Sequence, residues 1–189
     1  MTAHMGNYDI AGPTFAGKFN RKLNAVRAPE RDGDLQDYYE KKADRQGSEE
    51  FSVSYNTPGE MLGVDLVRML GRGEVVALQG DRVMGEVAPA EALVCGEMIK
   101  LPEGPHVLAL ASRSSIFPLF ILRVGWRRYR ILALPPLDVP RRERGIPKSE
   151  VIGRSVDGWG AVLTSVLNGH WDQWLEFGTV FNEEGVEEE

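Results

Sequence analysis

The sequence predicts a single α/β domain. Its 189 residues suit one domain. Apolar residues make up 42% of the chain and charged residues 26%, which is a globular rather than a disordered mixture. Helical patterns alternate with short apolar runs, as is typical of α/β folds. The one cysteine, Cys95, allows no internal disulfide, favours a reducing compartment and is expected to be a small buried residue.

The first half of the chain predicts helices and one buried strand. Residues 10–25 begin a helix, and the densely charged residues 27–50 form a solvated one. Thr57 suits the N-cap of the next helix and Pro58 its first position. Apolar residues then recur at helical spacing: Met61, Leu62, Val64, Leu66, Met69 and Leu70. The apolar run 75–78 predicts a buried parallel strand.

The second half predicts a hairpin, two strands and two helices. Turns and a hairpin fit residues 83–100, and a helix follows at 107–111. Residues 116–122 predict a core strand, with Pro118 at its start or at an unpaired position. Residues 128–134 alternate as a strand with one wet face. The last segment is an amphipathic helix with an apolar face made by Val156, Trp159, Val162, Leu163, Val166 and Leu167.

The net charge of −6 hides two opposite segments. Residues 183–189 carry five glutamates and form an acidic tail, so residues 1–182 are the predicted domain. The segment from Arg113 to Arg154 contains ten basic residues and only three acidic ones, and Trp126 lies within it. Such a basic field next to apolar segments attracts anionic lipid, acidic protein or phosphate, and a merely solvated rim is the alternative.

Several kinds of site lack their usual patterns. No Gly-x-Ser-x-Gly elbow supports a serine nucleophile, and the cysteine and histidines have no metal-ligand spacing. The Arg-rich residues 123–144 lack a stacking platform for nucleic acid. His106 and His170 are expected to be structural. Trp171 and Trp174 are expected to pack at a helix end with Phe177, and a membrane-interface role is the alternative.

His4 and Asp9, with Gly6 between them, are the strongest candidates for chemistry. If His4 lies in a turn entering a helix, Gly6 lets the backbone fold tightly. Asp9 then accepts a hydrogen bond from one imidazole nitrogen and leaves the other as a general base. Taken alone, this short motif also fits a surface histidine near a chain end.

The motif gains weight from four further blocks that follow it in order. These blocks are residues 73–82, 101–105, 116–120 and 170–177. From His4 to about Phe181 the chain resembles the bacterial lipid A biosynthesis acyltransferase family, within the lysophospholipid acyltransferase superfamily. The resemblance implies a central, mostly parallel or mixed β-sheet flanked by helices. It also implies acyl transfer from an acyl thioester, on acyl carrier protein or coenzyme A, to a hydroxyl of a glycolipid or lysolipid.

The resemblance also implies roles for particular residues. His4 is the general base and Asp9 its partner. The substrate-binding candidates are Asn7, Arg27, Asp81, Arg82, Glu103 and Gly104, and Arg82 or a backbone N–H is expected to stabilise the oxyanion. No metal or cofactor is expected beyond the acyl thioester co-substrate. The expected location is peripheral, on an anionic membrane at the cytoplasmic face of the bacterial inner membrane, with no nucleic-acid partner.

The chain departs from this family in two places. Only residues 1–3 precede His4, where family members carry an anchor and a further helical segment, so the sequence is expected to lack an N-terminal part. A frayed sheet, an open acyl pocket and an exposed apolar patch are expected beside His4. Residues 90–96 replace the family's Phe-Phe-Gly-like stretch. Two alternatives therefore stay open: an inactive lipid-binding remnant and a thioester hydrolase.

Overall fold

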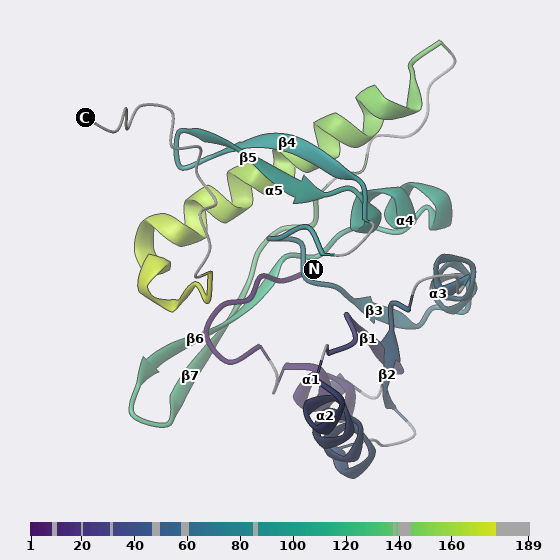
Figure 1. The fold of residues 1–189 in the computed structure, drawn as a ribbon. Coiled ribbons are helices and arrows are strands. Elements are labelled where there is room, and N and C mark those ends of the chain that lie inside the picture. The colour runs from purple at the N-terminus through teal and green to yellow at the C-terminus, as the bar shows by residue number, and fades with distance from the viewer. Residues whose placement is uncertain are drawn as a thin grey trace.

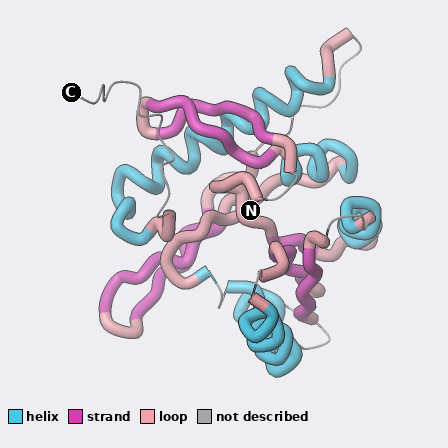
Figure 2. Tube along the Cα trace, viewed as in Figure 1, coloured by secondary structure: helices cyan, strands magenta, loops and turns pink. Residues whose placement is uncertain are grey.

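A computed structural model describes residues 1–8, 11–19, 21–30, 32–46, 50–57, 61–84, 87–137, 139 and 145–176. It contains a mixed α/β fold with one parallel and two antiparallel sheets (Figures 1 and 2). The predicted α/β class is therefore confirmed at this level.

The parallel sheet has β1 (Leu23–Arg27) at its centre, between β2 (Phe51–Tyr55) and β3 (Val75–Ala77). Both neighbours run parallel to β1, which confirms the parallel strand predicted at 75–78. The sequence patterns do not predict β1 or β2. The first residues of β1 fall in the helical region expected at 10–25, and Arg27 falls in the charged helix expected at 27–50.

The N-terminal segment, residues 1–6, joins this sheet to the rest of the molecule. Thr2 forms a parallel bridge with Gln79, just beyond β3. On the other side, Gly6 forms a parallel bridge with Ile121 of β6 (Leu119–Gly125). Ala3 and Met5 between these bridges are buried. As expected, the sheet is interrupted beside His4, because residues 1–6 form isolated bridges rather than a strand, yet the short segment is held on both sides.

β6 lies next to the N-terminal segment and forms a β-hairpin with β7 (Arg128–Ala133). Pro118 lies directly before β6, as expected for a residue that cannot donate to a ladder. Residues 120–122 of β6 are buried, which confirms the predicted core strand. The prediction of one wet face for β7 is wrong, because every residue of β7 except Leu132 is exposed.

A second hairpin is formed by β4 (Pro89–Val94) and β5 (Glu97–Pro102), which confirms the hairpin predicted near 83–100. Its two-residue turn is Cys95–Gly96, with φ of 53° and 94°. Cys95 is exposed, so the expectation that it is buried is wrong. A hairpin turn lies at the surface, whereas the expectation rested only on the usual burial of free cysteines.

Helices flank the strands: α1 (Ala11–Phe19), α2 (Gly33–Gln46), α3 (Leu62–Gly71), α4 (Gly104–Ser112) and α5 (Lys148–His170), followed by the 3₁₀ turn η2 (Trp171–Gln173). α3 begins at Leu62 with Met61 as its N-cap, so Thr57 is not the cap. α4 and α5 confirm the two predicted C-terminal helices, and α5 begins earlier than its first apolar residues indicated.

The main core lies where α5 crosses the β4–β5 hairpin and β6. Gly160 allows the close approach, because a Cβ there would lie 2.9 Å from the carbonyl oxygen of Leu93. Trp159 of α5 stacks on Phe120 of β6, with ring centroids 5.9 Å apart. A smaller core of Ala16, Leu23 and Phe51 lies between α1 and the parallel sheet. The N-terminal segment belongs to the main core, which fixes the position of His4.

Candidate active site

His4 lies near the end of the N-terminal segment, next to the chain that follows β3. Its imidazole Nδ1 is 2.9 Å from Oδ1 of Asp81, and its side chain is 20% exposed. The ring of Tyr8 meets the imidazole edge to face, with centroids 5.4 Å apart. The histidine is thus held on one side and accessible on another.

Asp81 is the buried acid of this pair, and its side chain is fully covered. Its second oxygen, Oδ2, accepts the backbone N–H of His4 at 3.0 Å and the indole N–H of Trp174 at 2.9 Å. Burial by itself raises the pKa of Asp81. The hydrogen bonds and charge attraction from His4, with the bond from Trp174, outweigh burial and hold the pKa below its ordinary value. Asp81 is therefore a carboxylate at neutral pH.

This geometry decides which nitrogen of a neutral His4 carries the proton. A carboxylate only accepts hydrogen bonds, so Nδ1 of His4 donates to Asp81. The lone pair of the neutral ring then lies on Nε2, where no described residue forms a hydrogen bond. A histidine oriented in this way by a buried carboxylate is suited to act as a general base.

Two glycines allow the close contacts around the pair. Gly6 has a φ of 59°, and a Cβ there would overlap the carbonyl oxygen of Ile121. This confirms the expected tight backbone at Gly6. Gly80 accepts a hydrogen bond from the indole of Trp159 at 2.7 Å, and a Cβ there would lie 3.0 Å from that nitrogen. The main core therefore positions the residue directly before Asp81.

The chain after η2 returns to the site. Trp174 forms an antiparallel bridge with Met5, and the N–H of Leu175 donates to the carbonyl of His4 at 2.7 Å. The sequence predicts Trp174 only as a packing residue at a helix end, and its hydrogen bond to Asp81 is not predicted. Packing at a helix end is also the wrong expectation for Trp171, which is exposed. Phe177, expected to pack with it, lies outside the described residues.

Arg82 follows Asp81 and places a positive charge beside the site. Its Nε is 3.1 Å from a carboxylate oxygen of Glu176, and its guanidinium also donates to the carbonyl of Leu175. Arg82 thus joins the segment after β3 to the returning chain. Its side chain is partly exposed, so the guanidinium also borders solvent.

Two other predicted substrate-binding residues, Asn7 and Arg27, lie on the same side of the fold as this pair. Asn7 is three residues after His4 in the chain, and its backbone N–H donates to the carbonyl of Ile121. Arg27 ends β1, and its guanidinium lies over the ring of Tyr39, 5.4 Å from the centroid. Because β1, β3 and the N-terminal segment run parallel, Arg27 and Asp81 occupy the same carboxyl edge. Ligands of open α/β sheets bind at this edge.

The structure does not bring the remaining candidates to His4. Glu103 is the N-cap of α4 and Gly104 its first residue. Within the described part of the chain, no hydrogen bond or ion pair joins either residue to His4 or Asp81. Asp9, the partner expected from the motif, lies outside the described residues. The acid seen at the imidazole is Asp81, which the resemblance had suggested as a substrate-binding residue.

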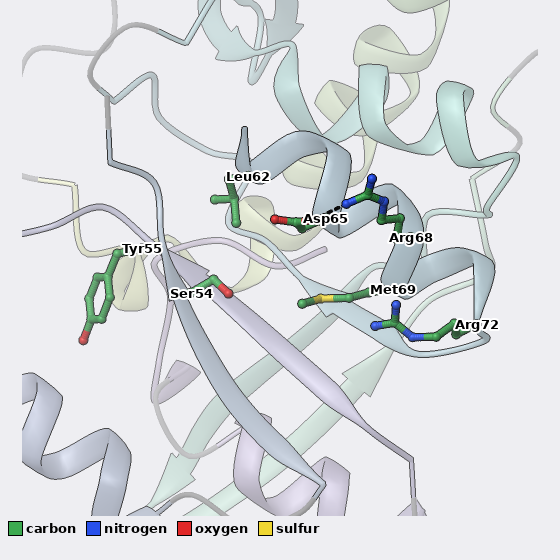
Figure 3. A pocket seen from close by; sticks show the side chains of 7 residues that line it. All are labelled: Ser54, Tyr55, Leu62, Asp65, Arg68, Met69 and Arg72. Atoms are coloured by element: carbon green, nitrogen blue, oxygen red, sulfur yellow. Dashed lines mark hydrogen bonds and ion pairs between the residues drawn. The ribbon is translucent and has the colours of Figure 1, made fainter. Parts of the chain in front are cut away.

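A separate cavity of about 400 Å³ lies between the end of β2 and α3 (Figure 3). Its lining includes Ser54 from the strand and Met69 from the helix, and these two side chains point toward each other. Arg68 at this cavity pairs with Asp65 at 3.0 Å. The cavity does not include His4 or Asp81, so we treat it as distinct from the candidate active site.

A second histidine pair is closed to substrate. Nδ1 of His106 lies 2.7 Å from the hydroxyl oxygen of Ser155, and both side chains are buried between α4 and α5. Burial lowers the pKa of His106 to about 4. This position agrees with the structural role expected for His106.

The described residues contain no cluster of three or more potential metal ligands. Across the same residues, no helix is both long enough and apolar enough to span a bilayer. Neither protein-family models nor curated proteins give a match to this chain.

Proposed function

We propose that this protein transfers an acyl group from an acyl thioester to a hydroxyl of a glycolipid or lysolipid, with His4 as the general base. The observation that carries the proposal is the His4–Asp81 pair, with a contact of 2.9 Å. The motif order described above supports the choice of acyl transfer over other reactions that need a base. Asp9 remains the partner expected from the motif, in addition to Asp81, which is the acid seen at the imidazole.

The proposed reaction begins when Nε2 of His4 takes the proton of the acceptor hydroxyl. The hydroxyl oxygen attacks the thioester carbonyl carbon and forms a tetrahedral oxyanion. When this intermediate collapses, the carbon–sulfur bond breaks and the new ester remains. The imidazolium returns its proton to the leaving thiolate, so His4 ends the cycle neutral.

Asp81 and Arg82 have distinct roles in this proposal. Asp81 holds the imidazole through Nδ1 and stabilises its positive charge after proton transfer. Arg82 is the candidate that stabilises the oxyanion, since it directly follows Asp81 in the chain and its side chain is partly exposed. Asn7 and Arg27 are the candidates for substrate contacts. Asn7 lies three residues after His4 in the chain, and Arg27 lies at the same carboxyl edge of the sheet as Asp81.

The test measures acyl transfer by the purified chain and by His4→Ala. Palmitoyl coenzyme A or the corresponding acyl carrier protein serves as donor, and a lysophospholipid or a glucosamine disaccharide lipid as acceptor. Mass spectrometry follows the acylated acceptor, which avoids reaction of a thiol reagent with the exposed Cys95. His4→Ala is expected to lower the rate by about 10²–10⁴. His170→Ala, at the end of α5, is the matched control and should keep the parent rate.

Three outcomes separate the candidate functions. Acyl product that depends on His4 supports the transferase. Thiol release without acylated product, still dependent on His4, indicates a thioester hydrolase that uses water as acceptor. Equal rates for His4→Ala and the parent, at equal folded fraction, would overturn His4 as the base.

A further inference from the structure

The outer part of the β6–β7 hairpin projects from the body of the protein. We call residues 123–131 the hairpin tip. The preceding residues 120–122 are buried in the main core, whereas every residue of the tip except Gly125 is exposed. In Figure 1 the paired strands extend beyond the other labelled elements, at the lower left. The tip therefore contributes little to the core, and its composition needs another explanation.

The hairpin tip combines basic and apolar side chains and contains no acidic residue. Its four arginines are Arg123, Arg127, Arg128 and Arg130. Trp126, in the turn, is 81% exposed. The other exposed large hydrophobic side chains of the tip are Val124, Tyr129 and Ile131. Such a mixture suits a surface that offers negative charge and an apolar layer together.

The turn of this hairpin departs from ordinary turn chemistry. Trp126 and Arg127 connect the strands, and Arg127 has a φ of 53°, in the left-handed region that glycine and asparagine favour. An arginine occupies this left-handed position instead, which disfavours the turn. Unfavourable backbone conformations of this kind cluster at binding and active sites.

We propose that the hairpin tip docks on an anionic lipid bilayer, with Trp126 at the headgroup level. Indole rings favour the membrane–water interface. The arginines complement the negative surface and bind lipid phosphates. The tip projects outward, which suits a broad plane, and its aliphatic residues Val124 and Ile131 would gain nothing from a nucleic-acid backbone. An acidic protein partner is left as an outcome of the test.

The base of the hairpin is attached directly to the candidate active site. The N–H of Asn7 donates to the carbonyl of Ile121 at 3.1 Å. The side chain of Gln173 accepts the N–H of Arg123 at 2.7 Å and donates to its carbonyl at 3.0 Å. Docking would therefore hold the segment containing His4 near lipid. The idea that docking brings His4 to a lipid acceptor rests on the proposed function. Docking itself does not require activity.

The experiment measures cosedimentation with vesicles at low salt. One vesicle set is phosphatidylcholine alone, and the other is phosphatidylcholine mixed with phosphatidylglycerol. The parent should bind the anionic vesicles and lose most of this binding at high salt. Arg127→Glu/Arg130→Glu should weaken binding at least about tenfold, because each nearby cation contributes to attraction at an anionic surface. Trp126→Ala should weaken binding without changing the charge.

Two control proteins separate docking from net charge and from activity. Lys100→Glu/Arg113→Glu changes the charge by the same amount at exposed positions on β5 and after α4, and should bind as the parent does. His4→Ala should also bind as the parent does, so failed catalysis and failed docking are distinguishable. Thermal melts establish that each variant is folded.

The proposal fails if folded parent protein binds both vesicle sets equally. It also fails if Arg127→Glu/Arg130→Glu and the control Lys100→Glu/Arg113→Glu weaken binding to the anionic vesicles by the same factor. Retention by an acidic carrier protein, with no retention by anionic vesicles, would assign the hairpin tip to a protein partner and overturn the membrane assignment.

Discussion

At Asp81, one carboxylate accepts three hydrogen bonds from two residues distant in sequence. His4 supplies a ring N–H and a backbone N–H, and Trp174 supplies its indole N–H. An asparagine side chain has only one acceptor oxygen, and its amide group would face a donor. The identity of this residue therefore affects both stability and the orientation of His4.

Asp81→Asn is expected to lower the free energy of unfolding by about 1–3 kcal/mol, because a buried donor loses its acceptor. It should also lower the acyl-transfer rate at least about tenfold, since the proton on Nδ1 of His4 is no longer held by a carboxylate. Urea unfolding and single-variant kinetics measure the two effects.

Trp174→Phe is the comparison for that experiment. It removes one donor and leaves both bonds from His4 to the carboxylate, so we expect a loss of about 1 kcal/mol and a smaller change in rate. If Asp81→Asn turned over as fast as the parent, the carboxylate would have no part in orienting the base.

Among the elements, the β4–β5 turn is the clearest case of sequence and conformation in conflict. Both turn residues, Cys95 and Gly96, have positive φ, as a type I′ turn requires. Cys95→Asn should raise the free energy of unfolding by about 0.5 kcal/mol, because asparagine tolerates this conformation better. Cys95→Val should lower it by about 1 kcal/mol, because a β-branched residue tolerates it poorly.

Urea unfolding of the three proteins ranks them directly. The N–H of Cys95 also donates to the hydroxyl of Thr164 on α5 at 2.9 Å, and both substitutions keep this backbone donor. An asparagine variant no more stable than the valine variant would show that the turn conformation is not what limits stability here.

The elements differ in how well the sequence predicted them. β3, α4 and α5 carry clear apolar patterns and were predicted. β1 was missed because its buried Asn24, which donates to Ser52, breaks the apolar run. β2 alternates apolar and polar residues as a half-buried strand does, but its five residues are few, and no element was predicted between the charged helix at 27–50 and Thr57. Nothing in the residues of β1 or β2 indicates that these two strands pair with each other.

The candidate site was only partly predictable for a similar reason. The motif predicts His4 as the base, and the resemblance implies Asp81 and Arg82 only as substrate-binding residues; nothing local shows that His4 and Asp81 touch. An acidic residue just beyond a predicted parallel strand was the available signal, because carboxyl ends of parallel strands share an edge. No comparable signal identified Trp174, whose ring packs on the core while its N–H reaches Asp81.

For the whole molecule, the buried His106 links stability to pH. Its pKa is about 4 in the folded protein and ordinarily near 6.5. Between these values the unfolded chain binds the extra proton. The free energy of unfolding should therefore fall as the pH drops from about 6.5 toward 4, by up to about 3 kcal/mol from this residue.

Denaturant unfolding at several pH values, for the parent and His106→Asn, isolates this contribution. The variant is expected to be less stable near neutral pH but to lose less stability between pH 6.5 and 4. Asp81 has a lowered pKa and acts mainly below this window, in both proteins. Parallel stability curves for the two proteins would mean that His106 does not titrate as its burial implies.

The spread of the site along the chain has a consequence for biosynthesis. His4 precedes Asp81 by 77 residues, and Trp174 follows Asp81 by a further 93. At ordinary ribosomal speeds, roughly 10–30 s separate the synthesis of His4 from that of Trp174. During the first part of that interval the N-terminal segment lacks β6, and throughout it the segment lacks the returning chain that later holds it in place. Contacts with such high sequence separation also slow folding. The site is therefore assembled only after α5 and the residues up to Trp174 have been synthesised.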